Sequence, residues 1–286
     1  MSQDWADRIA LQLSSKGLIQ KGICLILGAA DTGKTTLAAA LAKHLANNGP
    51  VGIVDADIGQ SHIGPPATVG WAIFDNPQID FAQLAVGGIS FVGDVTPLGH
   101  LLQLTAAITQ CVQQVSKLTE LIIIDTPGFI REPAAAALWW TVQQILQPKL
   151  ILAVQRNDEL KNILAGLRSF GLKLELLDCP SQIPLKSPQH RQNHRQKEFN
   201  NYFRDSCLYN ISLKNIAIQA GSNSCHASLI RRLVALRDQN CEDLAVGVIT
   251  KWQNNEDIVI VRAPKVDIRQ VRCLVVGDVS TDIADE

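Results

Sequence analysis

The chain has 286 residues, of which 47% are hydrophobic, and its 26 Lys and Arg against 27 Asp and Glu leave a net charge of −1. This length accommodates one large domain, or one large and one small. A net charge this close to zero excludes a positive potential over the whole surface that would hold a long nucleic acid. Any contact with nucleic acid must therefore come from a local basic patch. The polar start is no signal peptide, and no apolar run is long enough to span a membrane. Seven cysteines without a C-x-x-C pair indicate a reducing compartment, so we expect a cytoplasmic protein with no membrane contact.

The chain begins with a predicted helix, followed by a strand–loop–helix unit. The spacing of Trp5, Ile9 and Leu13 predicts an amphipathic helix over 4–15. Residues 23–27 predict a buried strand and 36–45 a helix, and the sequence between them is G-x-x-x-x-G-K-T, the pattern of a phosphate-binding loop. The residues predicted to contact a nucleoside triphosphate are Gly28, Ala29, Ala30, Asp31, Thr32, Gly33, Lys34, Thr35 and Thr36.

This loop predicts triphosphate chemistry for physical reasons. Its glycines let backbone N–H groups turn toward a polyphosphate, and the helix start adds partial positive charge. Lys34 is predicted to reach the outer phosphates, and the Thr35 hydroxyl to ligate Mg²⁺.

A second apolar run, 51–54, ends in Asp55-Ala56-Asp57-Ile58-Gly59-Gln60. In an extended chain, residues i and i+2 point to the same side, so two carboxylates would face one cleft. Two such carboxylates suit the binding of metal-bound water, for which Asp55 is a candidate, together with a general base that takes the proton of a hydroxyl acceptor. Capping of the following turn is the alternative for both residues.

The middle of the chain continues the alternation of strands and helices. Two short strands are predicted within 71–92, a helix over 98–118, and a buried strand over 121–124 that ends at Asp125. Asp125 is predicted to hold Mg²⁺, directly or through water, with turn capping as the alternative. Because ligands of such sheets bind at the carboxyl ends of the strands, the three aspartates and the phosphate loop should share one crevice.

The alternation then continues as far as about residue 177. A helix is predicted from Pro133 to about 146, a strand over 150–154, a helix near 157–169 and a strand over 172–177. The whole pattern predicts an α/β fold of the P-loop NTPase type, with a doubly wound, mostly parallel sheet.

The composition changes from Pro180 onward, where a polar segment interrupted by prolines begins. Arg191 and Arg195 lie four residues apart, on one face of a predicted helix within a lid at about 184–204. Such arginines can neutralise a transferring phosphoryl group, although a solvated basic helix face has the same spacing. Runs rich in Val and Ile follow, so we expect a P-loop nucleotide-binding domain over 1–206 and a small β-rich C-terminal domain over 207–286.

The order of these motifs resembles the polynucleotide 5′-hydroxyl kinases, the family of tRNA-splicing and pre-rRNA-processing P-loop kinases and their archaeal relatives. The resemblance rests on the phosphate loop, on Asp-x-Asp-x-Gly-Gln at 55–60, on Asp-Thr-Pro-Gly-Phe at 125–129 and on the Arg-x-x-x-Arg pair at 191–195. It implies Mg²⁺-dependent transfer from ATP, or another nucleoside triphosphate, to the 5′-hydroxyl end of RNA or DNA. It also implies a possible RNA-processing partner, for which the C-terminal domain is the candidate surface.

The resemblance also implies roles for individual residues. Lys34, Asp57, Arg191 and Arg195 would be catalytic, with Asp57 as the general base. Gln60 would orient a phosphate or a metal-bound water. The residues that match the clasp on the end of the substrate strand are Thr126, Gly128 and Phe129.

Three other functions compete with this one. A GTPase-type or ATPase switch would use Asp125-Thr126-Pro127-Gly128 to sense the outermost phosphate, but 155–158 lacks the Asn-Lys pair that reads guanine. A non-catalytic scaffold would bind nucleotide only to hold an RNA-processing partner. A kinase of small nucleosides is also open, since the acceptor end of the groove carries no readable sequence code.

Overall fold

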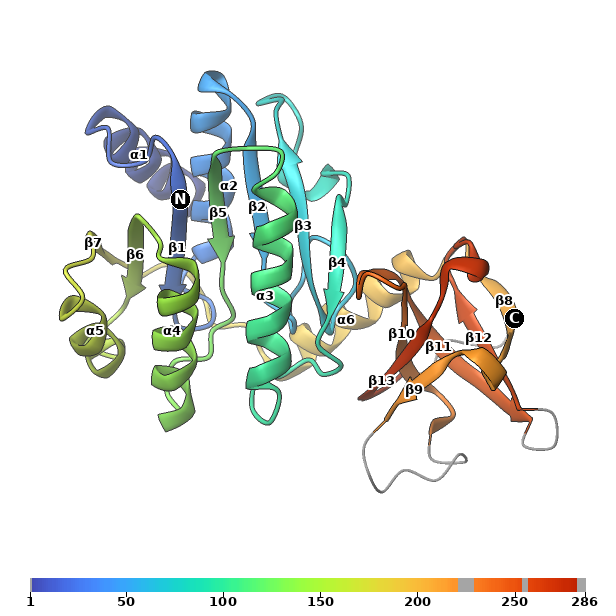
Figure 1. Cartoon of the computed structure of the whole chain (residues 1–286). Helices are drawn as coiled ribbons and strands as arrows, with labels where there is room; N and C mark the ends of the chain where they lie inside the picture. Colours follow the sequence, from blue (N-terminus) through green and yellow to red (C-terminus); the bar gives the residue numbers. More distant parts are fainter. Residues whose placement is uncertain (1, 221–228, 254–256, 282–286) are drawn as a thin grey trace.

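The computed structural model describes residues 2–220, 229–253 and 257–281. Its centre is a set of parallel strands in the order β7-β6-β1-β5-β2 (Figure 1). These strands are β1 (Gly22–Gly28), β2 (Val51–Asp55), β5 (Leu121–Asp125), β6 (Leu150–Gln155) and β7 (Leu174–Asp178). The predicted mostly parallel α/β sheet is confirmed, with P-loop strand β1 at its centre.

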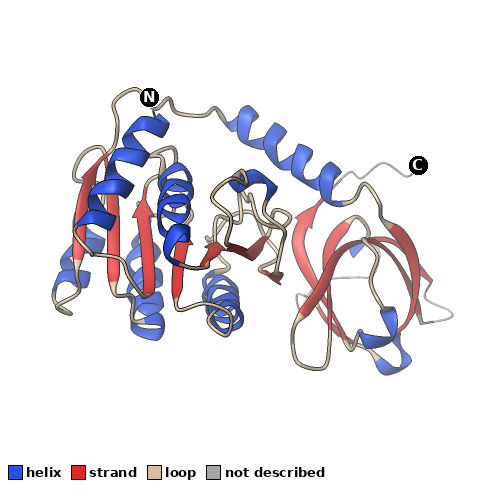
Figure 2. Cartoon of the chain, turned by 90° about the horizontal axis from the view of Figure 1, so that it is seen from above, coloured by secondary structure: helices blue, strands red, loops and turns tan. Residues whose placement is uncertain are grey.

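Helices cover both faces of this sheet (Figure 2). One face carries α1 (Ser2–Ser15) and α2 (Lys34–Leu45), and the other carries α3 (Leu101–Val115), α4 (Pro133–Leu146) and α5 (Lys161–Arg168). In β5, Ile122 and Ile124 pack under α3 and α4, while Ile123 packs under α2. Side chains of a strand alternate between faces, so a continuous apolar run is what a sheet covered on both sides requires.

Antiparallel strands extend the sheet beyond β2. They are β3 (Thr68–Phe74) and β4 (Gly88–Phe91), the two short strands predicted for this region. β3 begins three residues before the predicted range. Short 3₁₀ turns lie at Ala46–Asn48 and Phe81–Gln83.

The C-terminal strands curl around a hydrophobic core of their own (Figure 2). They are β8 (Cys207–Ser212), β9 (Ala217–Gln219), β10 (Arg232–Arg237), β11 (Asp243–Gln253), β12 (Ile258–Ala263) and β13 (Cys273–Ser280), with 3₁₀ turns at Leu213–Asn215 and Ile268–Gln270. Among the described residues, the strand pairing that continues them from the main sheet is one residue pair, Asp243 of β11 with Ile89 of β4. The β-rich character of this region is confirmed, and the domain boundary at 206 stays a prediction.

Helix α6 (Pro188–Tyr202) crosses from the main sheet to the C-terminal strands (Figure 2). Phe199 and Phe203 are buried with Leu233 and Val246 in a separate apolar cluster, and the Tyr202 hydroxyl accepts a 3.0 Å hydrogen bond from the backbone N–H of Val246. The second half of the predicted lid helix is therefore anchored on the C-terminal strands. Among the described residues, no helix combines the length and hydrophobicity that crossing a bilayer demands.

Candidate active site

The phosphate loop joins β1 to α2 with a backbone that only certain residues tolerate. Gly33 has a φ of 88°, and a Cβ on Gly28 would lie 2.5 Å from the carbonyl oxygen of Val154. The Lys34 ammonium donates a 2.8 Å hydrogen bond to the carbonyl of Ala29, within the loop itself. In this structure the lysine is thus folded onto its own loop, and reaching a phosphate requires it to leave that carbonyl.

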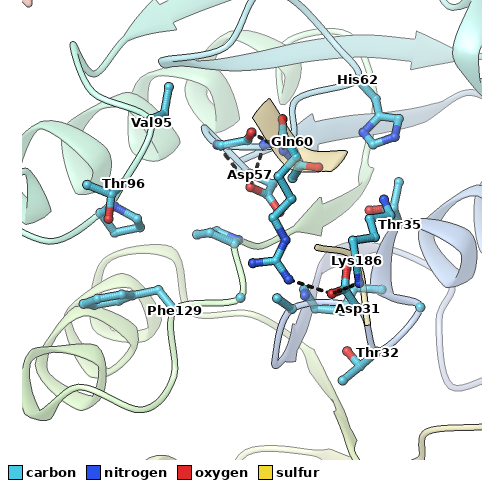
Figure 3. Close-up of a pocket in the computed structure, with 18 of the residues that line it drawn as sticks. Asp31, Thr32, Thr35, Asp57, Gln60, His62, Val95, Thr96, Phe129 and Lys186 are labelled. Carbon is cyan, nitrogen blue, oxygen red and sulfur yellow. Dashed lines mark hydrogen bonds and ion pairs between the residues drawn. The ribbon is translucent and has the colours of Figure 1, made fainter. Parts of the chain in front are cut away.

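The loop forms the floor of a cavity of about 500 Å³ at the carboxyl edge of the sheet (Figure 3). The sequence-predicted residues that line it are Ala30, Asp31, Thr32, Gly33, Lys34, Thr35, Thr36, Asp57, Gln60, Gly128, Phe129, Arg191 and Arg195. Residues from the phosphate loop, the loops after β2 and β5 and the lid helix are therefore brought together, as the strand-end argument predicted.

Asp57 lies across the cavity from the phosphate loop (Figure 3). Its Oδ1 accepts hydrogen bonds from the backbone N–H groups of Gly59 (3.2 Å) and Gln60 (3.1 Å). Its Oδ2 has no hydrogen bond within the part of the chain that the structure describes. One oxygen therefore fixes the orientation of the carboxylate, and the other is available to accept a proton.

Asp125 lies beneath the cavity, beside Thr35. The Thr35 hydroxyl donates a 2.5 Å hydrogen bond to its Oδ2, whereas its Oδ1 is buried and has no partner among the described residues. The pKa of Asp125 is raised to about 7, by burial first and by the charge of Asp55 second, with Lys34 opposing the shift. An orphaned buried carboxylate oxygen next to a hydroxyl fits the oxygen ligands that Mg²⁺ takes.

Asp55, like Asp125, is absent from the lining of the cavity, but unlike Asp125 it has both carboxylate oxygens engaged by backbone groups, contrary to the prediction that it faces the site. Its Oδ2 accepts hydrogen bonds from the backbone N–H groups of His62 (2.6 Å) and Ile63 (3.1 Å), and its Oδ1 from that of Asp57 (3.1 Å). Burial raises the pKa of Asp55 to about 7, against the opposing effect of the His62 N–H. The carboxylate organises the loop after β2, because the strand ends at Asp55 and the two aspartates no longer alternate as in an extended chain.

The predicted clasp is only partly at the cavity. Thr126 is fully buried and its hydroxyl donates a 2.7 Å hydrogen bond to the carbonyl of Ile26, so it holds β5 to β1 instead of facing a substrate. Gly128 packs against the phosphate loop, where a Cβ would lie 2.3 Å from the backbone nitrogen of Ala30. Phe129 borders the cavity but is only 7% exposed, which leaves little ring surface for stacking.

The lid helix meets the loop after β2 at two points. The Gln60 side-chain amide donates to the carbonyls of Gly59 (2.6 Å) and Arg191 (3.3 Å), and the rings of His62 and His194 lie 5.4 Å apart. Burial, followed by the neighbouring His62, lowers the pKa of His194. Gln60 thus contacts the lid backbone, a contact that the predicted role in orienting phosphate did not include.

Sequence reasoning missed several residues that line the cavity. Lys186 and Ile183 come from the proline-rich linker before α6, and Glu132 precedes α4 (Figure 3 labels Lys186). The Arg191 guanidinium donates a 2.6 Å hydrogen bond to the carboxylate of Asp31, forming an ion pair within the site. The positive charge of Lys186 is a signal that could have found it, but nothing in the local sequence shows which loop these side chains will reach.

Comparison with known proteins identifies relatives for most of the chain. The family described as "mRNA cleavage and polyadenylation factor CLP1 P-loop" matches residues 28–205. A protein of Pyrococcus abyssi named polyribonucleotide 5′-hydroxyl-kinase is 30% identical over 217 residues, which are 76% of this chain and 60% of that protein. A Thermococcus kodakarensis protein of the same name is 28% identical over 260 residues, covering 89% of this chain and 71% of that one.

Solved structures show the same fold. Clp1p, in a complex with a segment of Pcf11p, has a TM-score of 0.71 and 13% identity, covering 96% of this chain and 77% of that chain. The chain spans about 60% of the length of its Pyrococcus abyssi relative. From the phosphate loop through the lid helix, which is the region that builds the cavity, this chain belongs to the CLP1 P-loop family.

Proposed function

We propose that the protein transfers the γ-phosphoryl group of ATP, or of another nucleoside triphosphate, to the 5′-hydroxyl end of RNA. The observation that carries the proposal is the Oδ2 of Asp57, which accepts no hydrogen bond from the described residues and belongs to a side chain that lines one cavity with the phosphate loop and both lid arginines. The relatives named polyribonucleotide 5′-hydroxyl-kinase support the same reaction.

In the proposed reaction Asp57 accepts the proton of the 5′-hydroxyl while the oxygen of that hydroxyl forms a bond to the γ-phosphorus. The bond from the γ-phosphorus to the oxygen that bridges it to the β-phosphorus breaks, and the nucleoside diphosphate leaves with that oxygen. Lys34 and the two lid arginines offset the negative charge of the transferring group. The residues that would hold Mg²⁺ are Thr35 and Asp125, and the ion would neutralise charge on the outer phosphates.

The geometry of the loop after β6 disfavours a guanine-reading switch. The Arg156 guanidinium donates to the carbonyls of Asp31 (2.7 Å) and Ile183 (2.9 Å), and the Glu159 carboxylate accepts from the backbone N–H groups of Arg156 and Asn157. These groups are engaged in holding the loop and the lid linker together. Arg156, which stands where the guanine-reading motif has its lysine, therefore uses its guanidinium to hold the phosphate loop and the lid linker.

The test is an acceptor profile at fixed Mg²⁺ with γ-labelled ATP. We expect label on a 5′-hydroxyl RNA oligonucleotide and none on the same RNA with a 5′-phosphate. Matched DNA and a single nucleoside, as further acceptors, separate an RNA-end kinase from a DNA-end kinase and from a kinase of small nucleosides. Absence of label on every acceptor, in protein that binds ATP, refutes the proposal and favours the scaffold.

Substitution of the base tests the assignment within the site. Asp57→Asn should lower transfer by about 10² to 10⁴-fold while the affinity for triphosphate stays within about threefold. Asp75→Asn, at an exposed position after β3, is the matched control and should transfer at the wild-type rate. Transfer that survives in Asp57→Asn would show that another group takes the proton. A protein partner at the C-terminal strands stays a prediction.

A further inference from the structure

The phosphate loop contains one carboxylate of its own, that of Asp31. Its side chain is only 7% exposed, and its Oδ2 accepts hydrogen bonds from the Arg191 guanidinium (2.6 Å) and from the backbone N–H of Lys186 (2.9 Å). Its backbone carbonyl accepts from Arg156, which also donates to the carbonyl of Ile183. A single residue of the phosphate loop thus holds both the linker before α6 and the first lid arginine (Figure 3).

The two lid arginines are held differently. Arg191 uses one terminal nitrogen for Asp31, and its Nε and other terminal nitrogen make no hydrogen bond among the described residues. Arg195 lines the same cavity and has no ion pair in the described part of the chain. A guanidinium carries five donors in a rigid plane, so one edge can be fixed by a carboxylate while another faces an anion.

A buried carboxylate within a phosphate loop is unfavourable for the loop's ligand unless it is neutralised. An unpaired Asp31 would repel a triphosphate, whereas the Asp31–Arg191 pair brings no net charge and leaves guanidinium donors for a phosphate oxygen. Fixing the long arginine side chain before the ligand arrives also removes part of the entropy cost of ordering it on binding.

We propose that Asp31 is a positioning residue, which orients Arg191 toward the outermost phosphate of a bound nucleoside triphosphate. This assignment rests on the proposed function for the identity of the ligand. It gives the loop carboxylate a task that the phosphate-binding motif does not require, and it makes Arg191, but not Arg195, dependent on Asp31.

The proposal is tested by nucleotide binding to the full-length chain. Calorimetry with Mg²⁺ gives dissociation constants for ADP and for a non-hydrolysable ATP analogue. The constant for ADP divided by the constant for the analogue reports how much the contacts with the outermost phosphate add to binding. Asp31→Asn is suited to the test because Asn tolerates the positive φ of 59° at this position. We expect that ratio to fall on the order of tenfold in Asp31→Asn, because the substitution removes the charge-assisted bond that fixes Arg191.

Double substitutions test whether Asp31 acts on nucleotide binding through Arg191. Arg191→Gln should lower the ratio at least as much, because it also leaves Asp31 unpaired, and the double variant with Asp31→Asn should lower it no further than Arg191→Gln alone. Arg195→Gln is the matched control, whose effect should multiply with that of Asp31→Asn. Arg191→Lys keeps the charge but loses the planar fork, so it should also lower the ratio, and it serves if Asp31→Asn does not fold.

Two results overturn the proposal. The first is an unchanged ratio in Asp31→Asn, even if hydrogen exchange in 183–191 becomes faster, because the residue would then only fasten the lid. The second is independent, multiplying effects of Asp31→Asn and Arg191→Gln. A wild type that binds the ATP analogue but labels no acceptor refutes the proposed function and leaves these ratios measurable, so the two failures are distinguishable.

Discussion

Gly128 offers the sharpest test of how the loop after β5 supports the phosphate loop. An added Cβ would lie 2.3 Å from the backbone nitrogen and 2.6 Å from the Cα of Ala30, whereas ordinary van der Waals contacts begin near 3.4 Å. Gly128→Ala therefore requires backbone to move by about 1 Å, and a 1 Å misplacement in a catalytic site can cost about 100-fold. We expect the affinity for an ATP analogue to fall by about that factor in calorimetry, with little change in overall fold.

The matched control is Gly171→Ala, in the turn after α5. Beyond its two chain neighbours, no atom of the described residues lies within 4 Å of its added Cβ, but its φ of 67° is unfavourable for alanine. This variant should lose about 1 kcal/mol of unfolding free energy and bind the analogue like the wild type. Binding by Gly128→Ala within threefold of the wild-type value would refute the argument, because the loops would then be free to separate.

Three further outcomes are expected. Phe199→Ala should lower the unfolding free energy in urea by about 3–5 kcal/mol, since it empties a buried site under the lid helix, while Leu102→Ala at an 84% exposed position should change it by less than about 0.5 kcal/mol. Burial raises the pKa of Cys24 to about 12, so at pH 8 a thiolate-specific reagent should label exposed Cys207 long before Cys24, and equal rates by mass spectrometry would contradict the buried strand. Burial raises the pKa of Asp125 to about 7 from an unfolded value near 3.9, so its ionisation disfavours the fold and stability without metal should decline as pH rises from 5 to 8. Mg²⁺ binds the ionised form, so it should raise the unfolding temperature more at pH 8 than at pH 6, and equal increments would contradict the metal assignment.

The sequence predicted the elements whose signals are local. The phosphate loop is defined by nearest neighbours along the chain, Pro133 does begin α4, and the apolar runs at 121–124 and 150–154 are buried strands. Strand ends at the same edge of the sheet then brought Asp57 and the phosphate loop to one cavity, which is a general property of parallel sheets.

The sequence predictions were wrong where a side chain's position depends on contacts with residues elsewhere in the chain. The prediction for Asp55 assumed that the extended conformation continues to residue 57, but the strand ends at Asp55 and the amides of His62 and Ile63 fold back onto its carboxylate. Thr126, which the resemblance assigns to the substrate clasp, instead donates its hydroxyl to the carbonyl of Ile26 on β1. The Asp31–Arg191 pair joins residues 160 positions apart, and no local pattern encodes such a contact.

The anchoring of α6 has a consequence for signalling within the molecule. Its arginine-bearing half borders the nucleotide cavity, and its aromatic half is embedded against β10 and β11. Because one end of α6 is fixed on the C-terminal strands, its arginine-bearing end cannot move independently. A rearrangement of the lid must therefore strain either the 179–187 linker or the packing of the aromatic half against β10 and β11. A partner that binds the C-terminal strands and shifts α6 would therefore change the affinity of the cavity for nucleotide. Thermodynamic linkage then requires bound nucleotide to change the affinity for that partner by the same factor.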